Sequence, residues 1–223
     1  MRNIGWLCTC VLVLAAYALA APRQHVVAFG KWTTVKLLTG DDESKPVDMK
    51  VRPLSVDGRT KEFTTGPAHE VTERLFVVQR AYRLNDLLPQ EGGAARWRWE
   101  RGAWLLVDRV SGNSRAIPLP DFDAYSSEVS WFRDYAAYCG VSEDGEKAFT
   151  VVAQLGKRKP LLKKVEKVEK ANSEGTSQNC PAPLWSRAPA RVTFAPSGEP
   201  KFTFTMKSQA VDVAIGQIDE GEN

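Results

Sequence analysis

Histidine is scarce in this sequence: only His25 and His69 occur among 223 residues. Histidine is the commonest acid–base residue near neutral pH, so its scarcity limits catalytic options. His25 lies close to the expected start of the mature chain, where termini fray, and His69 follows Gly-Pro in an expected solvated loop. The sequence contains no HExxH, GxSxG or SxxK motif and no glycine-rich phosphate loop. These absences argue against a histidine-based triad or a zinc centre, and no cofactor is predicted.

Acidic residues are numerous but form no recognised ligand pattern. Asp41-Asp42-Glu43 and the pair Asp121 and Asp123 carry oxygen ligands, yet neither has the spacing of a dedicated calcium loop. Glycosidase chemistry needs two carboxyl groups about 5 to 10 Å apart in a cleft, which sequence spacing does not reveal. Solvated surface carboxylates are the simpler interpretation. A secreted hydrolase using carboxylate chemistry is the alternative to a non-enzymatic protein.

Long apolar runs are absent after the first twenty residues. There, Arg2 precedes Leu7–Ala20, which is shorter than the roughly 20 apolar residues of a membrane-spanning helix. Alanines at the −3 and −1 positions predict that residues 1–20 are a signal peptide cleaved between Ala20 and Ala21. An uncleaved membrane anchor is the alternative. We expect a secreted or periplasmic protein with no transmembrane segment after cleavage.

A strong net charge is also missing, because 30 Lys and Arg face 27 Asp and Glu, a formal net charge of +3. Such a balance gives no reason to expect nucleic acid as a partner. About 200 residues remain after cleavage, which is ample for one well-buried core. We expect a single β-rich domain over residues 21–218, followed by a disordered acidic tail over 219–223.

Four cysteines are present, but Cys8 and Cys10 lie in the predicted leader. The mature chain keeps Cys139 and Cys180, and an even pair in an oxidising compartment is most simply a disulfide. This bridge would close a loop of about 40 residues, for which the chain-entropy relation gives roughly 4 kcal/mol. The alternative is two free thiols, one buried in a strand and one in a loop.

Amphipathic helical patterns of ten or more residues are nearly absent, whereas short β-like runs are frequent. Residues 47–51 alternate clearly between apolar and charged side chains, as in a strand with one buried face. Asp57-Gly58 and Asp144-Gly145 predict tight hairpins, because such turns require positive φ. The pattern predicts an all-β domain of antiparallel hairpins.

The most informative hairpin consists of Tyr135–Val141 and Lys147–Leu155. Its second strand has a wholly apolar face and a mixed face, which is typical of a strand inside a sheet. Three other segments have expected structures. Gly66-Pro67 should end a strand, residues 96–108 should form two strands, and Leu161–Val168 should form either a lysine-rich edge strand or a helix.

A faint internal repeat links two hairpins. Residues 141–151 (VSEDGEKAFTV) match residues 194–204 (FAPSGEPKFTF) at an offset of 53, and residues 56–64 are a looser third copy. A period near 50 is in the range of propeller blades. The three hairpins resemble those of secreted β-propeller proteins. The resemblance implies an open propeller-like stack, and a β-sandwich is the alternative; it implies no catalytic residues.

Two surface features favour binding. Trp97 and Trp99 share one strand face, and paired tryptophans stack on sugars, rings or apolar patches of a partner, although a core role is the simpler alternative. The basic run Lys157–Lys170 either contacts anionic surfaces or protects an edge strand from aggregation. We therefore expect an exported, non-enzymatic binding or envelope-associated module, whose partner is another envelope protein or a polysaccharide.

Overall fold

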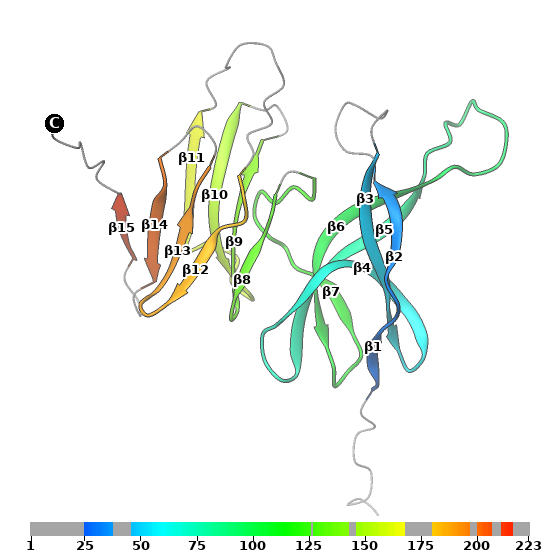
Figure 1. The fold of residues 1–223 in the computed structure, drawn as a ribbon, viewed down its shortest axis with the longest axis horizontal. Helices are drawn as coiled ribbons and strands as arrows, with labels where there is room; N and C mark the ends of the chain where they lie inside the picture. The colour runs from blue at the N-terminus through cyan, green and yellow to red at the C-terminus, as the bar shows by residue number, and fades with distance from the viewer. Residues whose placement is uncertain are drawn as a thin grey trace, which may run out of the picture.

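A computed structural model describes residues 25–37, 46–125, 127–142, 146–167, 180–196, 200–206 and 211–215. The predicted leader, the acidic run at 41–43, the Asp-Gly turn at 144–145 and the acidic tail all lie outside these ranges. All regular structure described is β-strand, arranged in three mostly antiparallel sheets (Figure 1). None of these residues forms a helix long and apolar enough to cross a bilayer. The predicted all-β class is confirmed.

The first half of the chain folds into a small barrel. Its strands are β1 (Val27–Phe29), β2 (Thr33–Leu37), β3 (Val47–Val56), β4 (Arg59–Glu70), β5 (Leu75–Asn85), β6 (Trp97–Asp108) and β7 (Ser114–Ala116). Pairing runs in the cyclic order β3-β2-β6-β5-β4 and back to β3. The ring closes through one parallel pair, Leu37 with Trp99, and every other pairing is antiparallel. Closure turns one face of the sheet into an interior.

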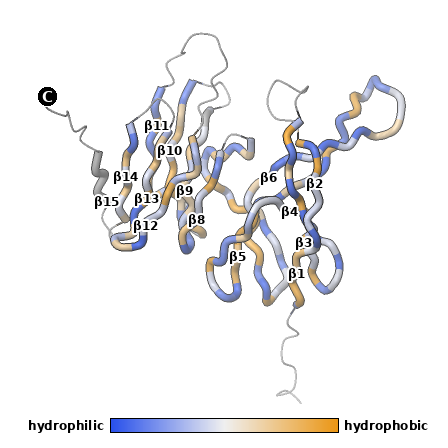
Figure 2. The backbone as a smooth tube through the Cα atoms, viewed as in Figure 1, coloured by the Kyte–Doolittle hydropathy of each residue, from blue (hydrophilic) through white to orange (hydrophobic). Residues whose placement is uncertain are grey.

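Two apolar clusters make up the barrel core. Hydrophobic and hydrophilic residues alternate along most strands (Figure 2), which directs the apolar ones to one face. Met49 and Val51 are buried as predicted, whereas Val47, on the same face, is exposed at the end of the strand. The buried members of the clusters are Leu37, Met49, Val51 and Ala81 in one, and Leu54, Phe76, Val78, Leu105 and Val107 in the other.

Two predicted strand boundaries are wrong because the long strands bend instead of ending. Gly66-Pro67 lies within β4, where the pairing with β5 shifts register and Gly66 has a φ of 67°. Residues 96–108 do not form two strands, because β6 passes through this stretch with a second register shift against β5. A β-bulge accommodates glycine or proline and bends the strand, as barrel curvature requires. The Asp57-Gly58 hairpin is confirmed, with φ values of 52° and 76°.

The second half contains two four-stranded antiparallel sheets. One comprises β8 (Ser130–Phe132), β9 (Tyr135–Val141), β10 (Lys147–Gln154) and β11 (Leu162–Lys167); the other comprises β12 (Leu184–Arg187), β13 (Ala190–Phe194), β14 (Phe202–Met206) and β15 (Val211–Ile215). Strands adjacent in the chain are adjacent in each sheet. β10 lies inside its sheet, as predicted. β11 is an edge strand, so the helix alternative for this segment is wrong.

The internal repeat corresponds to the β9–β10 and β13–β14 hairpins, the second and third strands of the two sheets. Phe149 pairs with Gly140, whereas its counterpart Phe202 pairs with Phe194. Equivalent residues of β10 and β14 are therefore 53 positions apart, as in the sequence match. Equivalent residues of β9 and β13 are 54 positions apart. A one-residue shift reverses the face of every side chain, so the ungapped match misaligns the first strand. The looser third copy lies in β3 and β4 of the barrel.

The two four-stranded sheets share an apolar core and a disulfide. Cys139 of β9 is bonded to Cys180, just before β12, with a Cα–Cα distance of 5.9 Å, in the usual range for disulfides. The Trp185 indole N–H donates to the Ser130 carbonyl at 3.1 Å and thereby links β12 to β8. The buried core residues are Ala137, Cys139, Val152, Cys180, Val192, Phe194, Phe202 and Phe204. The predicted disulfide is present.

The opposite face of the β8–β11 sheet meets the barrel. Trp104 of β6 and Trp131 of β8 make an edge-to-face contact, with ring centroids 5.4 Å apart. His69 stacks on Trp131, and its Nε2–H donates to the Arg133 carbonyl at 2.8 Å. Tyr138 is fully buried there and donates its hydroxyl to the Pro120 carbonyl. His69 is therefore a strand residue in an inter-sheet contact, and its expected place in a solvated loop is wrong.

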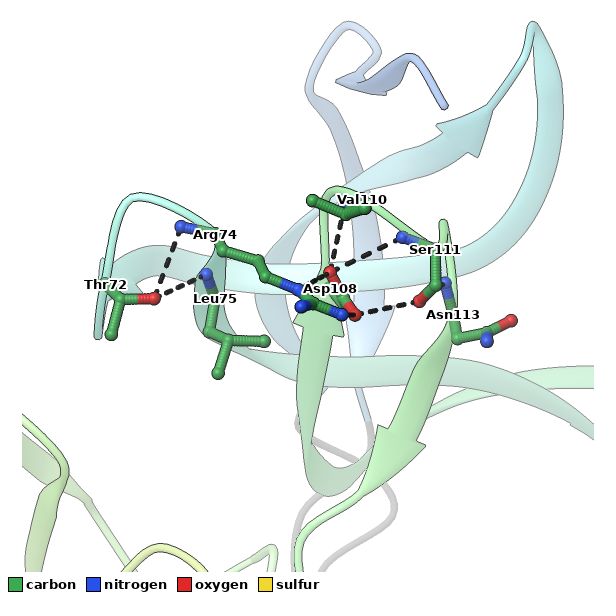
Figure 3. Close-up of polar contacts among 7 residues, drawn as sticks. All are labelled: Thr72, Arg74, Leu75, Asp108, Val110, Ser111 and Asn113. Carbon is green, nitrogen blue, oxygen red and sulfur yellow. Dashed lines mark hydrogen bonds and ion pairs between the residues drawn. The ribbon is translucent and has the colours of Figure 1, made fainter. Parts of the chain in front are cut away.

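Asp108 joins two turns at one end of the barrel (Figure 3). Its carboxylate accepts hydrogen bonds from Arg74 Nε at 2.7 Å, the Val110 N–H at 2.9 Å and Ser111 Oγ at 2.9 Å. Arg74 belongs to the β4–β5 turn, where Thr72 Oγ1 accepts hydrogen bonds from two backbone N–H groups. The Arg74 guanidinium, followed by the donors of the β6–β7 turn, holds the pKa of Asp108 well below its usual range.

We expect Asp108→Asn to lower the Tm at pH 7 and to reduce the loss of stability in acid. A depressed carboxyl pKa contributes stability above the ordinary value of about 4, and this contribution is lost as pH falls toward the folded-state pKa. Thermal melts from pH 7 to pH 2.5 should show the two proteins converging below about pH 4. The control is Asp48→Asn, which removes an exposed ion pair with Lys36. A Tm difference that does not change with pH would contradict the role assigned to Asp108.

Candidate binding site

The candidate site lies at the barrel end from which the loop between β5 and β6 protrudes (Figure 1). Asn85, the last residue of β5, accepts hydrogen bonds through Oδ1 from the Leu87 N–H at 3.2 Å and the Arg96 N–H at 3.0 Å. The Asp86 N–H donates to the Arg96 carbonyl at 2.7 Å. These bonds close the base of the loop and fix the start of β6, where Trp97 pairs with Asn85.

Trp97 and Trp99 differ in their surroundings, although both lie on one face of β6. Trp99 is partly buried in the barrel and makes an edge-to-face contact with Phe63, with ring centroids 5.3 Å apart. Trp97 lies one step beyond the core and is 60% exposed. Only Trp97 thus presents an accessible ring, while Trp99 packs beneath it as part of the core.

A cation lies on the same face as the two tryptophans. Arg83 of β5 is directly opposite Trp99, and its Cζ lies 5.4 Å from the Trp99 ring centroid and 5.8 Å from that of Trp97. Both distances allow cation–π attraction, which orients the guanidinium. The sequence reasoning missed Arg83, because it precedes the tryptophans by a whole loop and only the strand pairing brings it to them.

Arg83 differs from the neighbouring arginines in its charge environment. Arg96 forms an ion pair with Glu91, and Arg98 forms one with Asp86 at 3.0 Å. Arg83 is exposed and has no carboxylate partner among the described residues. Its positive charge is therefore not neutralised within this part of the structure.

Glu100 follows Trp99 on β6, so its side chain lies on the opposite face of the strand. Glu100 is buried, and its Oε2 has no hydrogen-bond partner in the described ranges. Burial raises the pKa of this carboxyl; Arg98 opposes the shift and Asp86 adds to it. Leu84, Leu88 and Val47 are also exposed apolar residues. Leu84 pairs with Arg98 and therefore lies on the face of the sheet opposite Trp97.

The other predicted candidates lie elsewhere and are not brought together. Asp121 forms an ion pair with Lys163 at 2.7 Å. Asp123 accepts a hydrogen bond from the Tyr125 N–H at 3.1 Å in a tight turn. Within the described ranges, no group of three or more His, Cys, Asp or Glu side chains is positioned to hold a metal ion. On edge strand β11, the ammonium group of Lys164 lies near Glu166 and over the Phe202 ring.

Scans against family models, curated proteins and solved structures gave no match. The chemistry of the site consists of an exposed indole, an adjacent guanidinium with no carboxylate partner in the described ranges, and a hydrogen-bonded loop base.

Proposed function

We propose that this chain is an exported, non-enzymatic binding module, and that Trp97 contacts a polysaccharide outside the cytoplasm. The observation that carries the proposal is the exposure of the Trp97 ring at the barrel end, on a face shared with Arg83 and Trp99. The predicted leader and the Cys139–Cys180 disulfide support export, since disulfides persist in oxidising compartments.

An indole in this position suits a sugar ring. The apolar C–H face of a pyranose packs on an aromatic ring, and a large rigid aromatic provides contact area at low entropic cost. Trp97 lies at the start of a long strand whose neighbouring loop is tied by three hydrogen bonds. The ring is therefore presented by a rigid scaffold, which favours binding because little flexibility is lost.

Two alternatives require other residues of the chain. Contact with an envelope protein would use Leu88 of the β5–β6 loop as well as Trp97, because protein interfaces bury broad apolar areas. A carboxylate hydrolase would need Asp121 or Asp123, both of which lie away from Trp97 in the chain and have partners of their own. Product release from a polysaccharide that is lost in Asp121→Asn would favour the hydrolase.

We expect Trp97→Ala and Trp99→Ala to separate binding from folding. Trp97→Ala removes an exposed ring, so the free energy of unfolding should change by no more than about 0.5 kcal/mol. Its affinity for polysaccharide should fall at least about tenfold, equivalent to about 1.4 kcal/mol. Trp99→Ala removes a core contact and should cost about 3 kcal/mol of stability.

Affinity electrophoresis in gels containing dextran, galactomannan, alginate or polygalacturonate measures the first effect, and urea unfolding measures the second. Leu88→Ala is the matched control, because it truncates another exposed apolar side chain on the neighbouring loop. Full retardation of a folded Trp97→Ala protein would refute the proposal. An equal loss in Leu88→Ala would show that the effect is not specific to the indole and would contradict the role assigned to the Trp97 ring.

A further inference from the structure

We infer that the polysaccharide is acidic, and that Arg83 binds its carboxylate while Trp97 supports a sugar ring; this inference rests on the proposed function. The observation behind it is the contrast among three arginines at one barrel end. Arg96 and Arg98 have carboxylate partners, whereas Arg83 has none among the described residues. Within the part of the chain that the structure describes, this exposed cation beside two indoles can accept an anion from solution.

Among the described residues, the recorded contacts of the Arg83 guanidinium are with two aromatic rings. Guanidinium groups contact aromatic rings through their π-face, while their N–H donors lie in the plane and point outward. The Arg83 Cζ lies within 6 Å of both ring centroids, so contact with either indole through the π-face leaves the in-plane donors for another partner. A planar fork of donors matches a carboxylate in bidentate geometry better than it matches a neutral hydroxyl.

The separation of the two groups favours a polymer with regularly spaced acids. Arg83 and Trp97 lie on adjacent strands with 5.8 Å between the guanidinium carbon and the ring centroid. A polyuronate carries a carboxylate on every sugar, so one unit can stack on Trp97 while the acid of the same or the next unit reaches Arg83. The predicted ligand class is therefore a uronic-acid polymer.

The test compares oligogalacturonate with its fully methyl-esterified form of the same length, using isothermal titration of the full mature chain. Esterification removes the charge and keeps the sugar rings. The wild-type protein should bind the acid at least about tenfold more tightly than the ester at low salt, and the difference should shrink as salt screens the charge. Arg83→Gln should abolish the preference and retain the weak binding of the ester.

Three further variants make the result specific. Arg83→Lys keeps the charge and should retain part of the preference, and Trp97→Ala should weaken binding of both forms. Arg191→Gln changes an exposed arginine on β13 and should behave as wild type. Thermal melts establish that each variant is folded.

The possible results distinguish failure of the acidic-ligand inference from failure of the proposed polysaccharide binding. Equal affinity for acid and ester, or an unchanged preference in folded Arg83→Gln, would overturn the inference and leave polysaccharide binding in place. Absence of binding to oligogalacturonate, its ester, alginate, dextran and galactomannan would overturn both.

Discussion

Replacing Cys139 and Cys180 together by alanine is expected to lower the free energy of unfolding by about 4 kcal/mol. The bridge spans 41 residues of sequence, and the chain-entropy relation assigns the loss to the larger conformational freedom of the uncrosslinked unfolded chain. Both cysteines are buried in the core between the two four-stranded sheets, where alanine introduces no polar group. Guanidinium unfolding followed by fluorescence measures the change.

The same loss should follow chemical reduction of the wild-type protein under native conditions. Reductant added to the alanine variant should have no effect, which makes this variant its own control. A decrease below about 1 kcal/mol would mean that the segment between Cys139 and Cys180 is already restricted in the unfolded chain, contrary to the basis of the prediction.

Phe194→Ala is expected to destabilise the protein by about 3 to 5 kcal/mol, the range for phenylalanine removed from a packed core. The side chain is fully buried, and its ring stacks on Phe202 with centroids 5.1 Å apart. It fills the space between the two four-stranded sheets, so truncation leaves a cavity facing both. Urea unfolding monitored by fluorescence and by circular dichroism tests the prediction.

The matched control is Arg191→Ala, an exposed change on the same strand that should cost less than about 0.5 kcal/mol. If the two variants lose equal stability, Phe194 does not contribute through packing. Near-complete retention of stability in Phe194→Ala would also contradict the shared core, because it would require the two sheets to pack without it.

The amino-acid sequence by itself determined the fold class of this protein and the position of several of its hairpins and strands. Alternation and Asp-Gly turns encode hairpins, because side-chain period and positive φ act over a few residues. They predicted the all-β class, the Asp57-Gly58 turn and the interior position of the strand Lys147–Gln154. The count of cysteines outside the predicted leader predicted the Cys139–Cys180 bridge, since those two residues allow only one pairing.

The tertiary structure alone decided where strands bend and which distant residues meet. The barrel closes through Leu37 and Trp99, which are far apart in the chain, and no local pattern encodes that contact. In a local sequence pattern, glycine and proline indicate the end of a strand. Here the pairing of β4 with β5 continues past Gly66-Pro67, and the two residues lie in a β-bulge. The sequence therefore predicts the secondary structure of a segment better than it predicts which other segments that segment contacts.

Some features of the candidate site follow from the sequence, and others follow only from the tertiary structure. The shared face of Trp97 and Trp99 follows from strand alternation, but their different burial follows from where the barrel interior ends. Arg83 joins them only because β5 pairs with β6 in one register, and a shift of one residue would turn its side chain to the other face. Register is a property of the assembled sheet, set by packing and bulges along whole strands, and for that reason the sequence alone did not place this cation beside the indoles.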